Sequence, residues 1–68
     1  MTVSEKIKEL RKALGLNQKQ LAEKAGLSAP VISYYESNQR LPDFVSLHRL
    51  CKALNTNPNV LLELVAEE

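Results

Sequence analysis

Residues 17–36, NQKQLAEKAGLSAPVISYYE, constrain the fold more than any other stretch of this chain. Their pattern predicts two short helices joined by a tight turn. Ala22 is small where the two helices would cross, and Gly26 follows four residues later, where the turn needs a positive φ. Ile32 comes six residues after Gly26 and is expected to point back into the junction. The outward residues of the second helix would then be free to contact a partner.

Capping signals predict a compact all-α bundle of five helices. The chain has 68 residues, which is the size of a single domain over residues 1–68. Thr2 with Glu5, and Asn17 with Gln20, match the capping-box pattern that starts a helix. The start signals of the other three helices are Ser28, Asp43 and Asn57.

Apolar residues recur at helical spacing in each predicted helix, and no strand-like alternation is present in the sequence. Helical positions place these residues on the side that faces the core. The expected core-facing residues are Ile7, Leu10, Leu14, Leu21, Ala22, Ala25, Ser28, Val31, Ile32, Tyr35, Phe44, Leu47, Leu50, Cys51, Leu54, Val60, Leu61, Leu64 and Val65.

Composition narrows the class of protein. A content of 44% hydrophobic and 25% charged residues is ordinary for a soluble globular domain, and no run of 18 apolar residues is present to span a membrane. Cys51 is the only cysteine, which fits a reducing, cytoplasmic location. His48 lies three residues before Cys51, but a structural zinc site normally needs four protein ligands. We therefore expect no metal, cofactor, small-molecule ligand or enzymatic activity.

Charge is distributed unevenly along the chain, although the net charge is only +1. Residues 1–24 hold six Lys or Arg and three Glu, which gives +3, whereas residues 53–68 hold three Glu and give −3. The basic end could face phosphates while the acidic end faces away. An ordinary solvated surface is the alternative explanation of the same charges.

The outward face of the helix after Gly26 is unusual because it carries no charge. At 100° per residue from Ile32, small and polar residues with one aromatic point away from the core. Serine can bond the edge of a base, and alanine or proline can touch a thymine methyl group. The face therefore favours insertion into the major groove of DNA, and a helix that merely packs is the alternative. The outward residues are Pro30, Ser33, Tyr34 and Ser37, with Ala29 on the flank.

Polar residues flank this helix on both sides. Gln18 begins the preceding helix, where backbone N–H groups favour anions, and Ser28 caps the outward helix. Asn38, Gln39 and Arg40 follow it on a loop. Phosphate contacts from both sides would hold the helix in register on a duplex. Because the outward face lacks a side chain for a bidentate base contact, specificity would depend on apolar contacts, on this loop or on DNA shape.

With these residues in place, the chain resembles the Cro/phage-repressor, or XRE-like, family of helix-turn-helix proteins over about residues 5–64. The stretches that carry the resemblance are IKELRKALGLNQKQLAEKAGLS, ISYYE, and LHRLCKALN with NPNVLL. The resemblance implies a lambda-repressor-like domain that binds double-stranded DNA. It implies base contacts by Ala29, Pro30, Ser33 and Tyr34, and phosphate contacts by Asn17, Gln18, Ser28, Ser37, Asn38, Gln39 and Arg40.

The resemblance also implies a structural ion pair between Arg11 and Glu36, which would orient the outward helix. A glycine is common in the family near Ser37 and Asn38, and here Asn38 is expected to adopt the left-handed conformation that asparagine tolerates.

The C-terminal half carries more apolar residues than one buried stripe requires, which predicts a homodimer. A wider core contact is the alternative. The expected function is a small transcriptional regulator, a repressor that acts as a dimer on a palindromic site with half-sites about 34 Å apart. A protein–protein interaction module, an adaptor or antirepressor-like protein, is the competing hypothesis. The residues expected at the dimer interface are Val45, Val60, Leu62 and Val65.

Overall fold

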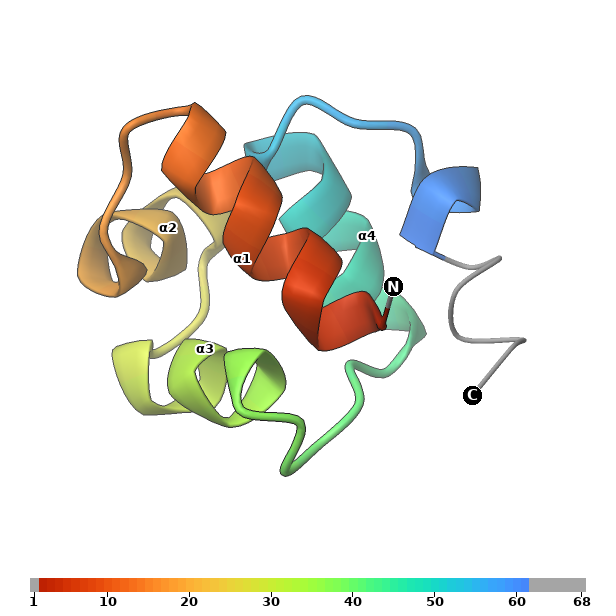
Figure 1. Cartoon of the computed structure of the whole chain (residues 1–68), viewed down its shortest axis with the longest axis horizontal. Coiled ribbons are helices and arrows are strands. Elements are labelled where there is room, and N and C mark those ends of the chain that lie inside the picture. The colour runs from red at the N-terminus through yellow and green to blue at the C-terminus, as the bar shows by residue number, and fades with distance from the viewer. Residues whose placement is uncertain (1, 62–68) are drawn as a thin grey trace.

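The computed structural model describes residues 2–61, and these residues form helices joined by short connections. The helices are α1 (Val3–Ala13), α2 (Gln18–Ala25), α3 (Ala29–Glu36) and α4 (Phe44–Ala53). A fifth helix starts at residue 58 and is followed to residue 61, where the described part of the chain ends. In Figure 1, α1 runs across the molecule in front of α4, while α2 and α3 lie to one side. The predicted all-α arrangement of five helices is confirmed.

Both predicted capping boxes are present. The Thr2 hydroxyl accepts the N–H of Glu5 at 3.2 Å, and the Glu5 carboxylate accepts the N–H of Thr2 at 3.0 Å. The hydrogen bond from the Thr2 backbone, and then that from its side chain, lower the pKa of Glu5. Asn17 and Gln20 make the same reciprocal bonds at 2.7 and 2.9 Å. Each pair satisfies backbone groups that a helix start leaves without partners.

The other three start signals also act as caps. Ser28 Oγ accepts the N–H of Val31 at 3.3 Å, and Asp43 Oδ1 accepts the N–H of Ser46 at 2.8 Å. Asn57 Oδ1 accepts the N–H of Asn59 at 2.9 Å. These bonds set where α3, α4 and the fifth helix begin.

The core lies between the helices, where α3 packs against α1 and α2, and α4 packs against α2. Ile7, Leu21, Ile32 and Leu50 are fully buried there. Val31 and Leu10 are partly buried and pack against this core. Of the residues expected to face inward, Leu64 and Val65 lie outside the described residues. The remaining buried apolar residues are Val3, Ala22, Ala25, Tyr35, Leu47, Cys51, Ala53, Leu54 and Leu61.

Four expectations about burial are wrong: Val60 is 36% exposed, and Phe44, Leu14 and Ser28 are exposed for identifiable reasons. Phe44 is 79% exposed, because it lies about 100° around α4 from the centre of the arc that Leu47 and its neighbours bury. Leu14 is exposed because it caps the C-terminus of α1, beyond the last turn that packs. Ser28 is exposed because it has an extended backbone, with φ −89° and ψ 152°, so a helical wheel does not describe its direction.

The turn between α2 and α3 has the geometry that the sequence predicted. Gly26 adopts the left-handed conformation, with φ 70° and ψ 32°. The N–H of Leu27 bonds the carbonyl of Ala22 at 2.8 Å, and this bond closes the end of α2. Ala22 and Ile32 are both buried. The turn thus fixes the angle at which α3 leaves α2.

Candidate nucleic-acid interface

The outward face of α3 is uncovered by the described chain. Pro30, Ser33, Tyr34 and Ser37 are exposed, and Ala29 is half-buried on the flank. In Figure 1, α3 forms one edge of the molecule. The structure therefore brings together on one surface the four predicted base contacts, which are Ala29, Pro30, Ser33 and Tyr34.

The N-terminal ends of α2 and α3 carry uncompensated positive dipoles. Neither helix has an acidic residue in its first turn. Gln18 is the first residue of α2, and Ser28 caps α3. Backbone N–H groups at such helix starts attract anions such as phosphate. Asn17 is exposed, but its side-chain oxygen is engaged in the cap of α2.

The expected ion pair between Arg11 and Glu36 is present and buried. Arg11 Nε donates to Glu36 Oε2 at 2.7 Å, and Nη2 donates to Oε1 at 3.0 Å. The two side chains are only 11% and 3% exposed. Arg11 Nη1 also donates to the carbonyl of Leu16 at 2.8 Å, so the guanidinium ties α1 to the connection before α2.

Glu36 also receives a hydrogen bond from α2. Gln18 Nε2 donates to Glu36 Oε1 at 3.3 Å. This single carboxylate therefore links α1, α2 and the last residue of α3. A side-chain amide has two N–H donors, so Gln18 keeps one for a further partner.

Hydrogen bonds hold the loop after α3 to α1 on one side and to α3 on the other. Asn38 has φ 63°, which is the left-handed conformation predicted for it. Ser4 Oγ on α1 donates to Asn38 Oδ1 at 3.2 Å. The carbonyl of Tyr34 accepts the N–H of Gln39 at 3.0 Å and that of Arg40 at 3.4 Å. Gln39 and Arg40 are exposed, and these hydrogen bonds hold their backbone in a fixed position relative to α3.

The predicted phosphate contacts thus form two groups that flank α3. One group, at the starts of α2 and α3, holds Asn17, Gln18 and Ser28, and the other follows the last turn of α3. In the second group, Ser37 Oγ bonds the carbonyl of Tyr34 at 3.3 Å, so its hydroxyl proton is engaged within the protein. This second group consists of Ser37, Asn38, Gln39 and Arg40.

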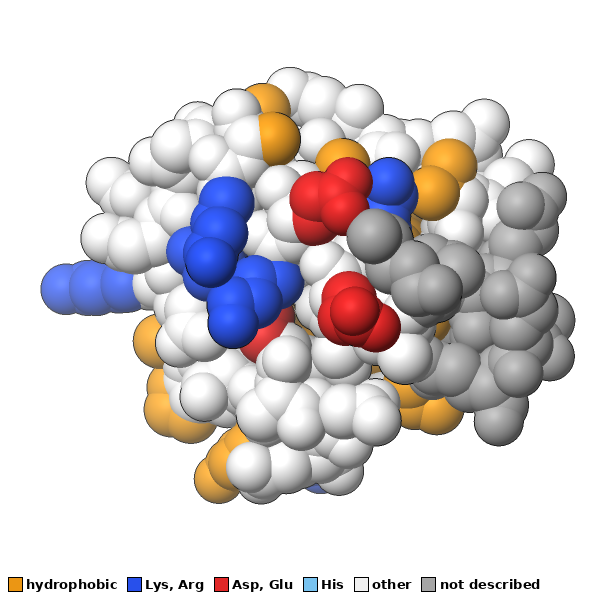
Figure 2. All heavy atoms as spheres, in the orientation of Figure 1, with side chains coloured by type: hydrophobic (Ala, Val, Ile, Leu, Met, Phe, Trp, Pro, Cys, Tyr) orange, Lys and Arg blue, Asp and Glu red, His pale blue; other side chains and the backbone are white. Residues whose placement is uncertain are grey.

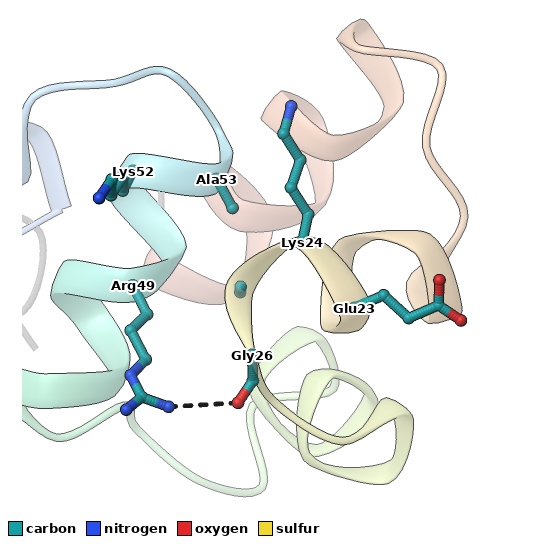
Figure 3. A pocket seen from close by; sticks show the side chains of 7 residues that line it. Glu23, Lys24, Gly26, Arg49, Lys52 and Ala53 are labelled. Carbon is teal, nitrogen blue, oxygen red and sulfur yellow. Dashed lines mark hydrogen bonds between the residues drawn. The ribbon is translucent and has the colours of Figure 1, made fainter.

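Basic residues do not form one continuous surface. Figure 2 shows a group of Lys and Arg side chains on the left of the α1 face, with acidic side chains beside it. Figure 3 shows a second basic region, a cleft between the ends of α2 and α4 that Lys24, Arg49 and Lys52 line. Arg49 Nη1 donates to the carbonyl of Gly26 at 3.2 Å. Cations at helix C-terminal ends offset the helix dipole, which gives this cleft a structural explanation.

Of the residues predicted at a dimer interface, Val45 is 63% exposed, and Val60, which was also expected on the inward side of the fifth helix, is 36% exposed. Leu62 and Val65 lie outside the described residues. Phe44, which the sequence pattern had assigned to the core, lies beside Val45, and the two line a shallow hollow with His48.

Three further observations concern membrane spans, metal ligands and the cysteine. Within residues 2–61, no helix combines the length and the apolar character needed to cross a membrane. Over the same residues, no three His, Cys, Asp or Glu side chains gather as metal ligands would. Burial raises the pKa of the Cys51 thiol.

A tight glycine turn between two packed helices, the second with an uncovered outer face, defines a helix-turn-helix domain. The model of the HTH_3 helix-turn-helix family matches residues 7–61. The chain belongs to this family, which is of the XRE, or Cro/C1, type. The family is one of transcriptional regulators and is not enzymatic.

Individual relatives support the same assignment. YqaE, an uncharacterized HTH-type transcriptional regulator of Bacillus subtilis (strain 168), is 33% identical over 60 residues, which are 88% of this chain and 52% of that protein. The chain thus spans about half the length of this curated relative. The P22 c2 repressor in complex with a synthetic operator is 33% identical, with a TM-score of 0.86 over 90% of this chain and 92% of that chain. SinR, a master regulator for biofilm formation solved in complex with DNA, is 31% identical, with a TM-score of 0.85 over 90% and 98% of the two chains.

Proposed function

We propose that this domain binds double-stranded DNA in a sequence-specific manner, with α3 in the major groove. The observation that carries the proposal is the uncharged, uncovered face of α3 between two groups of polar residues. Acidic side chains are absent from this face, so phosphates would not be repelled. The P22 c2 repressor and SinR, which share the fold, were each solved in complex with DNA.

Ala29, Pro30 and Ser33 are the proposed base contacts. The Ser33 hydroxyl is exposed and can donate to or accept from a base edge, and the apolar surfaces of Ala29 and Pro30 suit thymine methyl groups. Tyr34 shares the face but differs from these three, because Arg40 lies over its ring.

Phosphates would be bound on both flanks. Gln18 would use the N–H that Glu36 leaves free, together with the backbone at the start of α2. The other proposed contacts are Asn17, Ser28, Asn38, Gln39 and Arg40, together with Ser37, whose hydroxyl would exchange its bond to the Tyr34 carbonyl for one to a phosphate. Because most of these groups are neutral, the contacts would position the helix more than they would add electrostatic attraction.

We further propose that the protein acts inside the cell as a repressor, by forming a dimer that occludes a promoter. Phe44 and Val45 offer an exposed apolar surface near the start of α4, and Val60 offers a smaller one. A two-fold dimer would place two α3 helices on successive turns of one duplex face, about 34 Å apart, and would read a palindrome. Leu62 and Val65 are proposed to extend the same interface.

A protein–protein interaction module is the second candidate. The net charge of only +1 and the apolar surface at Phe44 and Val45 favour it. The salt dependence of binding separates the two. A DNA complex loses affinity as salt rises, with a slope of log affinity against log salt of about −0.9 for each cationic phosphate contact, and Arg40 is the one cation among the contacts proposed above. An apolar protein interface would respond little.

The test is a fluorescence anisotropy titration of a labelled random-sequence duplex at low salt, followed by a salt series. Saturable binding that weakens as salt rises supports the DNA-binding proposal. The absence of binding to any duplex at low salt would contradict it and would favour the interaction module.

A further inference from the structure

One contact on the outward face of α3 joins the side chains of Tyr34 and Arg40. The guanidinium carbon of Arg40 lies over the Tyr34 ring, 5.9 Å from its centroid. Tyr34 is 41% exposed, so part of the ring remains in contact with solvent. A cation over an aromatic face is attracted by the ring quadrupole when it lies within about 6 Å of the ring centroid.

The backbone strengthens this pairing. The carbonyl of Tyr34 accepts the N–H of Gln39 at 3.0 Å and that of Arg40 at 3.4 Å. The hydroxyl of Ser37 donates to the same carbonyl at 3.3 Å. Arg40 is therefore held to Tyr34 through the main chain as well as through the ring. Fewer orientations of its side chain remain to be lost when it binds a ligand.

Arg40 differs from the other two arginines of the chain in its hydrogen bonding. Arg11 donates to Glu36 and to the carbonyl of Leu16, and Arg49 donates to the carbonyl of Gly26. Within the described residues, no side-chain donor of Arg40 has an acceptor. Because these donors have no acceptor within the described residues, Arg40 can present two of its N–H groups to one anion.

We propose that Tyr34 is a positioning residue whose ring holds the Arg40 guanidinium against the end of α3, so that the two bind a backbone phosphate as one unit. This inference rests on the proposed DNA binding and changes the role of Tyr34 within it. Tyr34 would contribute to affinity for every sequence instead of distinguishing bases. Sequence discrimination would be left to Ala29, Pro30 and Ser33.

The test is a double-mutant cycle on DNA affinity, using a preferred duplex and a random-sequence duplex. The variants are Tyr34→Phe, Tyr34→Leu, Arg40→Ala and Tyr34→Leu with Arg40→Ala. Lys52→Ala, in the basic cleft between α2 and α4, is the control for removal of a cation away from α3. Circular dichroism melting of each variant verifies that it is folded.

Tyr34→Phe keeps the ring and is expected to bind like the wild type. Tyr34→Leu should lower the affinity for both duplexes by the same factor, about 2- to 5-fold, so that the ratio of the two affinities does not change. Arg40→Ala should weaken binding further and lower the slope of log affinity against log salt by about 0.9. In the Arg40→Ala background, Tyr34→Leu should have no additional effect, because the ring would have no guanidinium to hold. Lys52→Ala should leave affinity unchanged.

Two outcomes would overturn the positioning role while the proposed function stands. One is that the wild type binds DNA but the double variant loses affinity by the full sum of the Tyr34→Leu and Arg40→Ala losses. The other is a Tyr34→Leu variant whose preferred sequence changes. A wild-type protein that binds no duplex at low salt would instead overturn the proposed function itself, and this inference with it.

Discussion

Glu36 accepts two N–H groups of Arg11, at 2.7 and 3.0 Å, and so joins α1 to the last residue of α3. Because both side chains are buried, removing one leaves the other charge without compensation. Arg11→Ala is expected to lower the free energy of unfolding by about 3–5 kcal/mol. Thermal unfolding followed by circular dichroism measures it, and an unchanged midpoint would contradict the structural role of the pair.

A double variant provides the control for this prediction. Arg11→Met with Glu36→Leu replaces both charges by apolar groups and should be less destabilised than Arg11→Ala, because no unpaired charge is left in the core. Arg11→Ala should also weaken DNA binding, since the end of α3 would lose its link to α1. A double variant that is less stable than Arg11→Ala would show that charge compensation is not the main effect.

Ser28 allows folding and DNA binding to be separated. Ser28→Ala removes the cap of α3 and should cost about 1 kcal/mol of stability. Ser28→Asp and Ser28→Asn both keep a capping oxygen and should be close to the wild type in stability. Only the aspartate adds a negative charge at the exposed start of α3, so it should weaken DNA binding well below that of the asparagine variant. Equal affinities for these two variants would argue against a phosphate near Ser28.

Acid should weaken the cap of α4 within a defined pH window. The backbone N–H of Ser46, and then its side chain, donate to Asp43 and hold the pKa of that carboxyl below its ordinary value. The contribution of Asp43 is therefore complete above the unfolded-state pKa of about 3.9 and is lost as the pH falls through the lower folded-state pKa.

The variant Asp43→Asn isolates this effect, because an asparagine side chain caps a helix without titrating. The difference in unfolding midpoint between wild type and Asp43→Asn should be constant above about pH 5. At lower pH the midpoint of the wild type should fall relative to that of Asp43→Asn. Thermal unfolding of both proteins across the acid range measures it. A difference that stays constant down to about pH 2 would contradict the prediction.

The exposed apolar residues of α4 should affect association and not folding. Phe44→Ser with Val45→Ser should change monomer stability by no more than about 0.5 kcal/mol per site, because both side chains are largely exposed. In sedimentation at micromolar concentration, the wild type should dimerise and this variant should not. Leu14→Ser, at the exposed end of α1, is the matched control and should dimerise normally. A wild type that stays monomeric with and without DNA would contradict the proposed interface.

Local hydrogen-bonding patterns made much of this fold predictable from the sequence. The two capping boxes depend on residues three apart, and the turn at Gly26 and the left-handed Asn38 depend on single backbone conformations. Such features are determined within a few residues, so their sequence signals are direct. The family resemblance added the pairing of Arg11 with Glu36, which are 25 residues apart and which no local pattern would indicate.

The features that the sequence did not reveal depend on tertiary geometry. The exposure of Phe44 follows from how α4 is rotated against the core, which a helical wheel gives only within a wide arc. The position of the Arg40 guanidinium over the Tyr34 ring requires a loop that turns back toward α3, and the bond from Arg49 to Gly26 requires α4 to pack against the end of α2. Each of these contacts joins residues that have no recognisable relation in sequence spacing.

Selection of bound sites from random duplex DNA tests the central claim most directly, because it reports binding and sequence preference together. At low ionic strength the wild type is expected to enrich one motif, with two inverted half-sites centred about one helical turn apart. Ser33→Ala should enrich a motif that differs at a defined position in each half-site. Recovery of no preferred sequence by the wild type would contradict the account that the outward face of α3 reads DNA.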